Sequence, residues 1–162
     1  MGGEGLGPGC LSQCWPASFE VEGTGYHSAE QFMMAEKARL FGDEEMRIQI
    51  METLLPGQAR ALGRAVRGFS DGFWQERRLG IVLQGNREKF IQNEALGAYL
   101  LGTGDDILVE ASPTDTVWGI GLEGDHDDSG YPHKWKGLNL LGFALMEVRD
   151  LLRGLPGKEP SG

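Results

Sequence analysis

The feature that most constrains the fold is a succession of short helical segments over residues 28–102. Ser28 and Gln31 have the spacing of a capping box, in which the serine side chain accepts a hydrogen bond from an early helical N–H. This pattern predicts a helix that ends at Gly42, and Asp43 is placed to cap the next one. Because a new helix begins so soon after each stop, we expect a fold built mainly from packed helices.

Breaking residues and apolar periodicity predict the remaining helices. Pro56 and Gly57 interrupt the second helix, and a third short helix is expected over residues 59–66. Apolar residues at helical spacing predict two further helices, over residues 71–92 and 95–101. A final helix is predicted from the shared apolar face of Leu141, Ala144, Leu145, Val148 and Leu152.

Three segments have the composition or alternation of β-strands. Residues 19–22 alternate apolar and polar side chains before a glycine, which predicts a short strand that enters a turn. Residues 107–111 and 117–122 are rich in β-favourable side chains and flank a turn at Pro113, so we expect them to pair. The resulting expectation is a set of helices around a small sheet.

The chain has 162 residues, which suits one domain. Glycine and proline at both ends predict flexible tails at residues 1–9 and 154–162, with a folded domain over residues 10–153. The net charge of −9 disfavours a general nucleic-acid or anionic-membrane surface, so a bound phosphate must meet a local basic pocket. Two cysteines only, and no apolar run long enough to cross a membrane, lead us to expect a cytoplasmic protein.

Two groups of side chains are candidates for chemistry. Glu30 and Lys37 are seven residues apart on one helix, so they share a face at a separation of about 10 Å and can flank one ligand. The helix dipole is expected to favour the ionised form of Glu30, and the alternative interpretation is a charge that only stabilises the helix start. Glu110, Asp115 and Trp118 form the second group around the turn, where the alternative is a set of solvated turn acids.

Three tryptophans and one acidic loop are further candidates for a binding site. An indole can stack on a nucleobase, so Trp74, Trp118 and Trp135 are candidates, although each fits equally well in the core or at its rim. The stretch from Asp125 resembles the opening of a calcium-binding loop. Its twelfth position is Lys136, which cannot supply the bidentate carboxylate that calcium requires. We therefore expect no metal and no redox cofactor.

Several motifs together resemble one known family, the NADAR family. The resemblance begins in the helix at residues 27–38, with sequence HSAEQFMMAEKA, and covers about residues 11–152. The motifs that carry it are Leu62-Gly63-Arg64, Phe73-Trp74, Arg87-x-Lys89-Phe90, Leu108-Val109-Glu110-Ala111-Ser112-Pro113-x-Asp115, Trp118-Gly119 and Gly137-x-Asn139-x-Leu141-Gly142. One departure is at the N-terminus, where glycine-rich sequence replaces the usual aromatic-rich strand and suggests a shortened start.

The resemblance implies an α+β fold, a mostly helical single domain around a small β-sheet. It implies an N-glycosidase that hydrolyses a ribosyl–nitrogen bond, either in a phosphoribosylamino-pyrimidine of riboflavin biosynthesis or in ADP-ribosylated guanine, as in nucleic acid. The alternatives are a non-catalytic module that binds ADP-ribose or a nucleotide, and a structural protein with surface carboxylates only.

Nine residues are the expected site. Glu30, Glu110 and Asp115 are the carboxylates that can stabilise positive charge on the sugar, and Lys37 can instead form a Schiff base with the opened sugar. The expected substrate-binding residues are Trp74 and Trp118 against the base, Arg87 and Lys89 at the phosphate, and Asn139.

Overall fold

The structure is a computed structural model and describes residues 6–156. This part of the chain forms six α-helices and one small antiparallel sheet that packs on the first and fourth of them, so the expected mostly helical fold is confirmed. The helices are α1 (Ala29–Leu40), α2 (Glu44–Glu52), α3 (Pro56–Arg64), α4 (Asp71–Gln92), α5 (Glu94–Gly102) and α6 (Leu140–Arg153). The strands are β1 (Phe19–Val21) and β2 (Thr24–Tyr26), and two 3₁₀ turns are η1 (Pro8–Leu11) and η2 (Pro132–Lys134).

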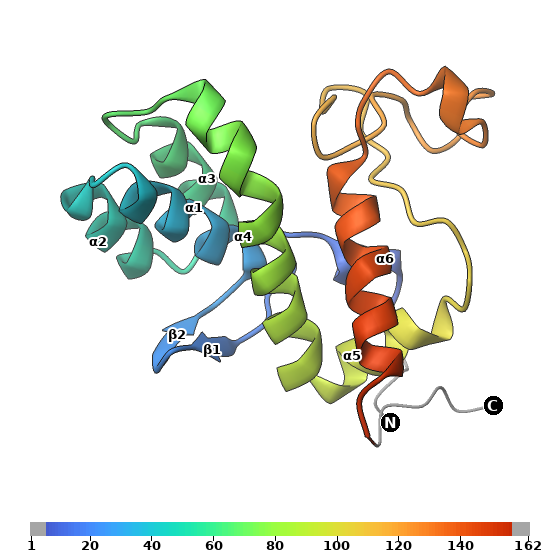
Figure 1. Cartoon of the computed structure of the whole chain (residues 1–162), viewed down its shortest axis with the longest axis horizontal. Coiled ribbons are helices and arrows are strands. Elements are labelled where there is room, and N and C mark those ends of the chain that lie inside the picture. Colours follow the sequence, from blue (N-terminus) through green and yellow to red (C-terminus); the bar gives the residue numbers. More distant parts are fainter. Residues whose placement is uncertain (1–5, 157–162) are drawn as a thin grey trace.

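Helix α4 is the central element of the molecule. It packs against α1 on one side and against α5 and α6 on the other, while α2 and α3 complete the group around α1 (Figure 1). Two glycines allow these helices to approach closely. A Cβ at Gly85 of α4 would lie 2.7 Å from the Phe32 ring of α1, and a Cβ at Gly63 of α3 would overlap the Met34 side chain. These contacts fix the positions of α3 and α4 relative to α1.

The predicted helix starts are confirmed in atomic detail. Ser28 Oγ accepts a hydrogen bond from Gln31 N at 3.0 Å, and Asp43 Oδ1 accepts one from Met46 N at 3.2 Å. The Gln31 side chain reaches back one residue further than a capping box requires, because its Oε1 accepts from His27 N at 2.7 Å. Each of these bonds satisfies a backbone N–H that the helix itself leaves without a partner.

The strand predicted at residues 19–22 is β1, which pairs Phe19 with Tyr26 of β2. The second strand was not predicted, since Thr24–Tyr26 is too short to show alternation. Glu22 and Gly23 make the turn with φ of 51° and 82°. The hairpin packs its aromatic face on α1, where the Tyr26 and Phe32 ring centroids are 5.0 Å apart.

The two strands predicted at residues 107–111 and 117–122 are wrong, because both segments are irregular loops. A single backbone bond joins them, from Ile120 N to Glu110 O at 2.9 Å. The carbonyls of residues 117–120 accept from residues 136–141 instead, as in the bond from Asn139 N to Gly119 O at 3.0 Å. The loop thus closes against the start of α6.

Part of each predicted tail lies outside the described residues, namely residues 1–5 and 157–162. Within the described part, Leu6 and Leu155 pack against the core, and Pro8 and Gly9 belong to η1. Among residues 6–156, no helix combines the length and the apolar character that crossing a membrane requires.

Candidate active site

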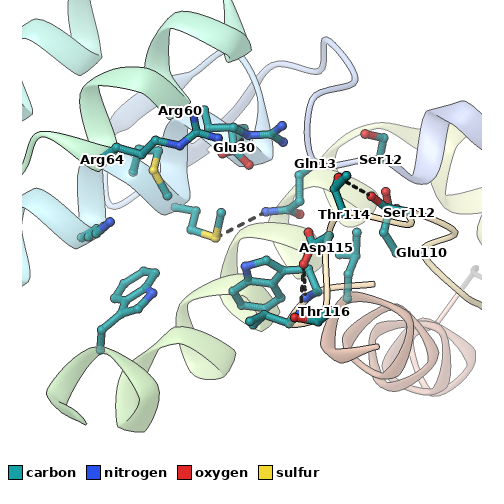
Figure 2. A pocket seen from close by; sticks show the side chains of 17 residues that line it. Ser12, Gln13, Glu30, Arg60, Arg64, Glu110, Ser112, Thr114, Asp115 and Thr116 are labelled. Atoms are coloured by element: carbon teal, nitrogen blue, oxygen red, sulfur yellow. Dashed lines mark hydrogen bonds and ion pairs between the residues drawn. The ribbon is translucent and has the colours of Figure 1, made fainter. Parts of the chain in front are cut away.

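A cavity of about 470 Å³ lies between α1 and α3, the first turn of α4 and the loop at residues 110–118. Six of the nine predicted site residues line it: Glu30, Lys37, Trp74, Glu110, Asp115 and Trp118. In Figure 2, Glu30, Arg60 and Arg64 lie on one side of the cavity, and Glu110, Ser112 and Asp115 lie on the other. Residues that are far apart in the sequence therefore line the same cavity.

Glu30 is the most buried carboxylate in the cavity, with an exposed fraction of 2%. It sits in the first turn of α1, where its backbone N–H donates to Gln13 O at 2.9 Å and its Oε1 accepts from Arg60 Nε at 3.1 Å. Burial raises the pKa of Glu30, and the nearby Arg60 guanidinium opposes this effect without cancelling it. The helix dipole was expected to favour the ionised form, but desolvation is the larger influence.

Lys37 lies two turns further along α1 and is half-buried. Its Nζ is 4.8 Å from the centroid of the Phe69 ring and 5.5 Å from that of Trp74, so aromatic faces surround the ammonium group. Burial lowers the pKa of Lys37 and the charge of Arg64 lowers it further, while Glu30 acts in the opposite direction. The amine is therefore easier to deprotonate than an ordinary lysine.

A tight turn positions Asp115 and Trp118. Asp115 Oδ1 accepts hydrogen bonds from the backbone N–H groups of Val117 at 3.0 Å and Trp118 at 2.8 Å. The aspartate side chain thus holds the turn that presents the Trp118 ring to the cavity, which is a typical role of aspartate in turns.

Glu110 faces the cavity from residues 107–111, the first of the two segments that were predicted as strands. Hydrogen bonds of its backbone hold it there. Its N–H donates to Asn139 Oδ1 at 3.0 Å, and its carbonyl accepts from Ile120 N at 2.9 Å. Burial raises the pKa of Glu110, and the negative charge of Asp115 adds to the shift. The cavity therefore holds two glutamates that bind protons more readily than in water.

The structure does not bring the other three predicted residues to the cavity. Arg87 is exposed and pairs with Glu88 at 3.3 Å. Lys89 is fully buried behind the cavity wall, where its Nζ donates to Ser12 O at 2.8 Å and burial lowers its pKa to about 8. Asn139 is also fully buried, and besides the bond to Glu110 it donates to Leu108 O at 3.0 Å. Lys89 and Asn139 support the cavity walls from behind.

Two arginines that sequence reasoning did not place in the site line the cavity. Arg60 and Arg64 are four residues apart on α3 and so share one face, a spacing that could have indicated them. Trp135, by contrast, is not among the lining residues, and its Nε1 donates to Ser129 O at 2.8 Å. In the part of the chain that the structure describes, no three His, Cys, Asp or Glu side chains form a group that could hold a metal ion.

The sequence matches the NADAR domain over residues 4–153. It is 44% identical to the N-glycosidase R617 of Acanthamoeba polyphaga mimivirus, a match that covers 86% of this chain and 85% of the relative. A riboflavin biosynthesis protein of Vibrio vulnificus is 33% identical over 90% of this chain and 36% of its own length. The NMR structure of the Escherichia coli protein YbiA superposes with a TM-score of 0.73 and 30% identity, over 89% of this chain and 77% of that one.

These similarities agree with the motifs from which the family was inferred. The fold is that of YbiA, and the similarity to an N-glycosidase over most of the chain confirms the expected enzyme class, a hydrolase of N-glycosyl bonds. The chain belongs to the NADAR domain family.

Proposed function

We propose that this enzyme hydrolyses the ribosyl–nitrogen bond of a phosphoribosylamino-pyrimidine, an intermediate of riboflavin biosynthesis. The observation that carries the proposal is the buried Glu30 carboxylate, which faces a cavity that also presents two indoles and a second glutamate. The similarity to a riboflavin biosynthesis protein over 90% of the chain supports this substrate class. A cavity of about 470 Å³ has the size typical of small-molecule sites.

Glu30 is proposed to stabilise the sugar as the bond breaks. When the bond between the anomeric carbon and nitrogen lengthens, positive charge develops on the sugar ring, and a fixed carboxylate is the group that best stabilises it. Arg60 holds the Glu30 carboxylate at 3.1 Å, so little reorganisation is needed during the reaction. Water then adds to the anomeric carbon, and its proton passes to the Glu110 carboxylate, which has given its own proton to the leaving nitrogen.

Glu110 is proposed as the acid that protonates the departing nitrogen. Burial and the charge of Asp115 raise its pKa, so more of it carries a proton near neutral pH than an exposed glutamate would. The nitrogen accepts this proton as it leaves with the bonding electron pair. Asp115, whose Oδ1 holds the backbone turn, positions this part of the wall.

Lys37 offers a second route through the same cavity. A deprotonated amine can attack the anomeric carbon of the ring-opened sugar, expel the base and form a Schiff base, which water then hydrolyses. The lowered pKa of Lys37 supports this route, because it increases the fraction of neutral amine. In both routes the overall products are the free base and ribose 5-phosphate.

Trp118 is proposed to stack on the base. It is partly exposed in the cavity, whereas Trp74 is 8% exposed and already packs beside the Lys37 ammonium. Stacking of a base on an aromatic ring contributes about 1–3 kcal/mol. A flat heterocycle beside Trp118 would also lie close to Glu110, on the same wall of the cavity.

A turnover assay tests the proposal. The purified protein and Glu30→Gln would be incubated separately with the phosphoribosylamino-pyrimidine and with ADP-ribosylated guanine, and the free base would be measured by chromatography. Release from the pyrimidine by the wild type, lost in the variant, is the expected result. Release only from ADP-ribosylated guanine would reassign the substrate. Binding of ADP-ribose without release from either compound would favour a non-catalytic module.

A further inference from the structure

The two arginines of the cavity differ in what they already bind. Arg60 donates from Nε to Glu30 at 3.1 Å and from Nη2 to Cys14 Sγ at 3.1 Å, so two of its N–H groups already have partners and one of these holds the Glu30 carboxylate. Arg64 lines the same cavity one turn later on α3, and its side chain is exposed. Across residues 6–156, no carboxylate lies within ion-pair distance of Arg64.

The two walls of the cavity differ in net charge. The α1–α3 wall supplies three cations, Lys37, Arg60 and Arg64, and one carboxylate, Glu30. Glu110 and Asp115 come from the loop, on the side of the cavity opposite Arg60 and Arg64 (Figure 2). Arg64 and Lys37 are close enough for the charge of Arg64 to affect Lys37. In a chain with a net charge of −9, such a basic wall is a local feature that favours an anionic group.

We infer that Arg64 binds the phosphate of a ribosyl-phosphate substrate at the α1–α3 wall of the cavity. This rests on the proposed function and adds an orientation to it. The planar guanidinium can donate two parallel hydrogen bonds to phosphate oxygens, which a neutral side chain cannot replace. With the phosphate at Arg64, the base lies toward Glu110 and Trp118. The sugar carbon lies between the two walls, beside Glu30.

The inference assigns the phosphate to a residue other than the two predicted from the sequence. Arg87 pairs with Glu88 outside the cavity, and the Lys89 ammonium is buried against Ser12 O. Arg60 holds Glu30, so its removal would disturb the carboxylate as well as any phosphate contact. Substitution of Arg64 leaves the bond between Arg60 and Glu30 in place, so its effect on phosphate binding can be measured separately.

Kinetics with and without the substrate phosphate test the inference. Wild type, Arg64→Ala, Arg64→Lys and the control Arg39→Ala would be compared on the phosphoribosylamino-pyrimidine and on its dephosphorylated form. Arg39 is an exposed arginine of α1 that lies outside the cavity and pairs with Glu36 at 3.8 Å. Because charge-assisted hydrogen bonds contribute about 1.5–3 kcal/mol, kcat/KM of Arg64→Ala should fall about tenfold to hundredfold on the phosphorylated substrate.

On the dephosphorylated substrate, Arg64→Ala should match the wild type within about twofold. Arg64→Lys should recover part of the loss, since it keeps the charge without the two-pronged geometry. Arg39→Ala should equal the wild type on both substrates. An equal loss by Arg64→Ala on both substrates would overturn the inference, because the residue would then act independently of the phosphate.

Binding of ribose 5-phosphate, measured by calorimetry, separates this inference from the proposed function. Wild type should bind ribose 5-phosphate at least about tenfold more tightly than Arg64→Ala does. The two proteins should bind ribose, which has no phosphate, with equal affinity. Equal binding of ribose 5-phosphate by both proteins, or no binding by the wild type, overturns the phosphate site whatever the turnover result. Intact binding without turnover of the pyrimidine overturns the proposed function alone.

Discussion

At the scale of single residues, Glu30 combines burial with a charge partner. Its side chain is 2% exposed and receives one hydrogen bond from Arg60 at 3.1 Å. A buried carboxylate with a single cationic partner is costly to desolvate, and carboxylates whose pKa is shifted in this way are enriched at functional sites. The same residue at the surface of a helix start would only stabilise the helix, which is why the local sequence left both interpretations open.

Substitution of Glu30 by glutamine should remove most activity and preserve the fold. The amide keeps the size of the side chain but cannot stabilise a cationic sugar, so kcat should fall by at least about a hundredfold. The matched control is Glu36→Gln, on the same helix but outside the cavity, which should leave kcat unchanged. Steady-state kinetics, with circular dichroism as a check on folding, measure both. Near-wild-type turnover by Glu30→Gln would remove Glu30 from the mechanism.

Lys37 decides between the two proposed routes. If the amine forms a Schiff base, borohydride added during turnover should reduce it and leave a sugar adduct on Lys37, which mass spectrometry detects. Lys37→Arg keeps the positive charge but lacks the amine, so it should abolish this turnover. An active Lys37→Arg protein without any adduct would assign catalysis to the carboxylates and leave Lys37 an electrostatic role.

At the scale of elements, Asn139 joins the 107–122 loop to the start of α6. It accepts from Glu110 N and donates to Leu108 O, both at 3.0 Å, and its φ of 51° lies in the left-handed region that asparagine tolerates. The two segments that were expected to pair with each other are thus held by a third. This contact also places Glu110 at the cavity.

Asn139→Ala should destabilise the protein by about 2–4 kcal/mol, because it leaves two partly buried backbone groups without their partner and adds strain at positive φ. Asn139→Gly removes the strain but not the lost bonds, so it should recover only part of the stability. Asn139→Asp keeps the acceptor for Glu110 N and should retain more activity than either. Urea unfolding and kcat of the three variants check this. Wild-type stability of Asn139→Ala would contradict the proposed support of the loop.

At the scale of the whole molecule, Lys89 connects segments that are 77 residues apart. From α4 its Nζ reaches Ser12 O, and the next residue, Gln13, accepts from Asn86 Nδ2 at 2.7 Å and from the backbone of Glu30. The N-terminal segment is therefore fastened to both α4 and α1, and it forms part of the cavity wall. Burial of an ammonium group is the energetic cost of this arrangement.

This cost predicts how stability depends on pH. The pKa of Lys89 is about 8 in the folded protein, whereas an ordinary lysine, as in the unfolded chain, has a pKa of 10.5. Between these two pH values the unfolded chain therefore binds one more proton than the folded one. The free energy of unfolding should therefore rise with pH through this window, by roughly 3 kcal/mol at most. Below about pH 8 both states are protonated and the contribution is constant.

Lys89→Met removes this group and supplies the control. The difference in unfolding free energy between wild type and variant should grow in favour of the wild type from pH 7 to pH 10, as measured by urea titration. Cys10 and Cys14 lie nearby, and burial raises the pKa of both thiols while the charge of Lys89 lowers it, so the loss of Lys89 also changes their titration in the variant. A difference that stays constant with pH would show that Lys89 is not titrating in this range.

Local sequence determined the helices, their starts and part of the candidate site. The Ser28 and Asp43 caps depend on backbone groups within three residues, and Glu30 and Lys37 share a face by helical periodicity alone. The turn at Asp115 is also local, since its side chain bonds the two backbone N–H groups that follow closely. Features of this kind need no knowledge of distant contacts, so they could be predicted.

Tertiary structure decided the features whose partners lie far along the chain. Residues 107–122 have the composition of strands, but most of their backbone hydrogen bonds go to residues 136–141, which no local pattern shows. Lys89 looks like an ordinary helix charge, and only the approach of Ser12 makes it a buried contact. In the same way, Arg60 and Arg64 became cavity residues because α3 packs against α1. Long-range packing decides which face of each helix meets the cavity.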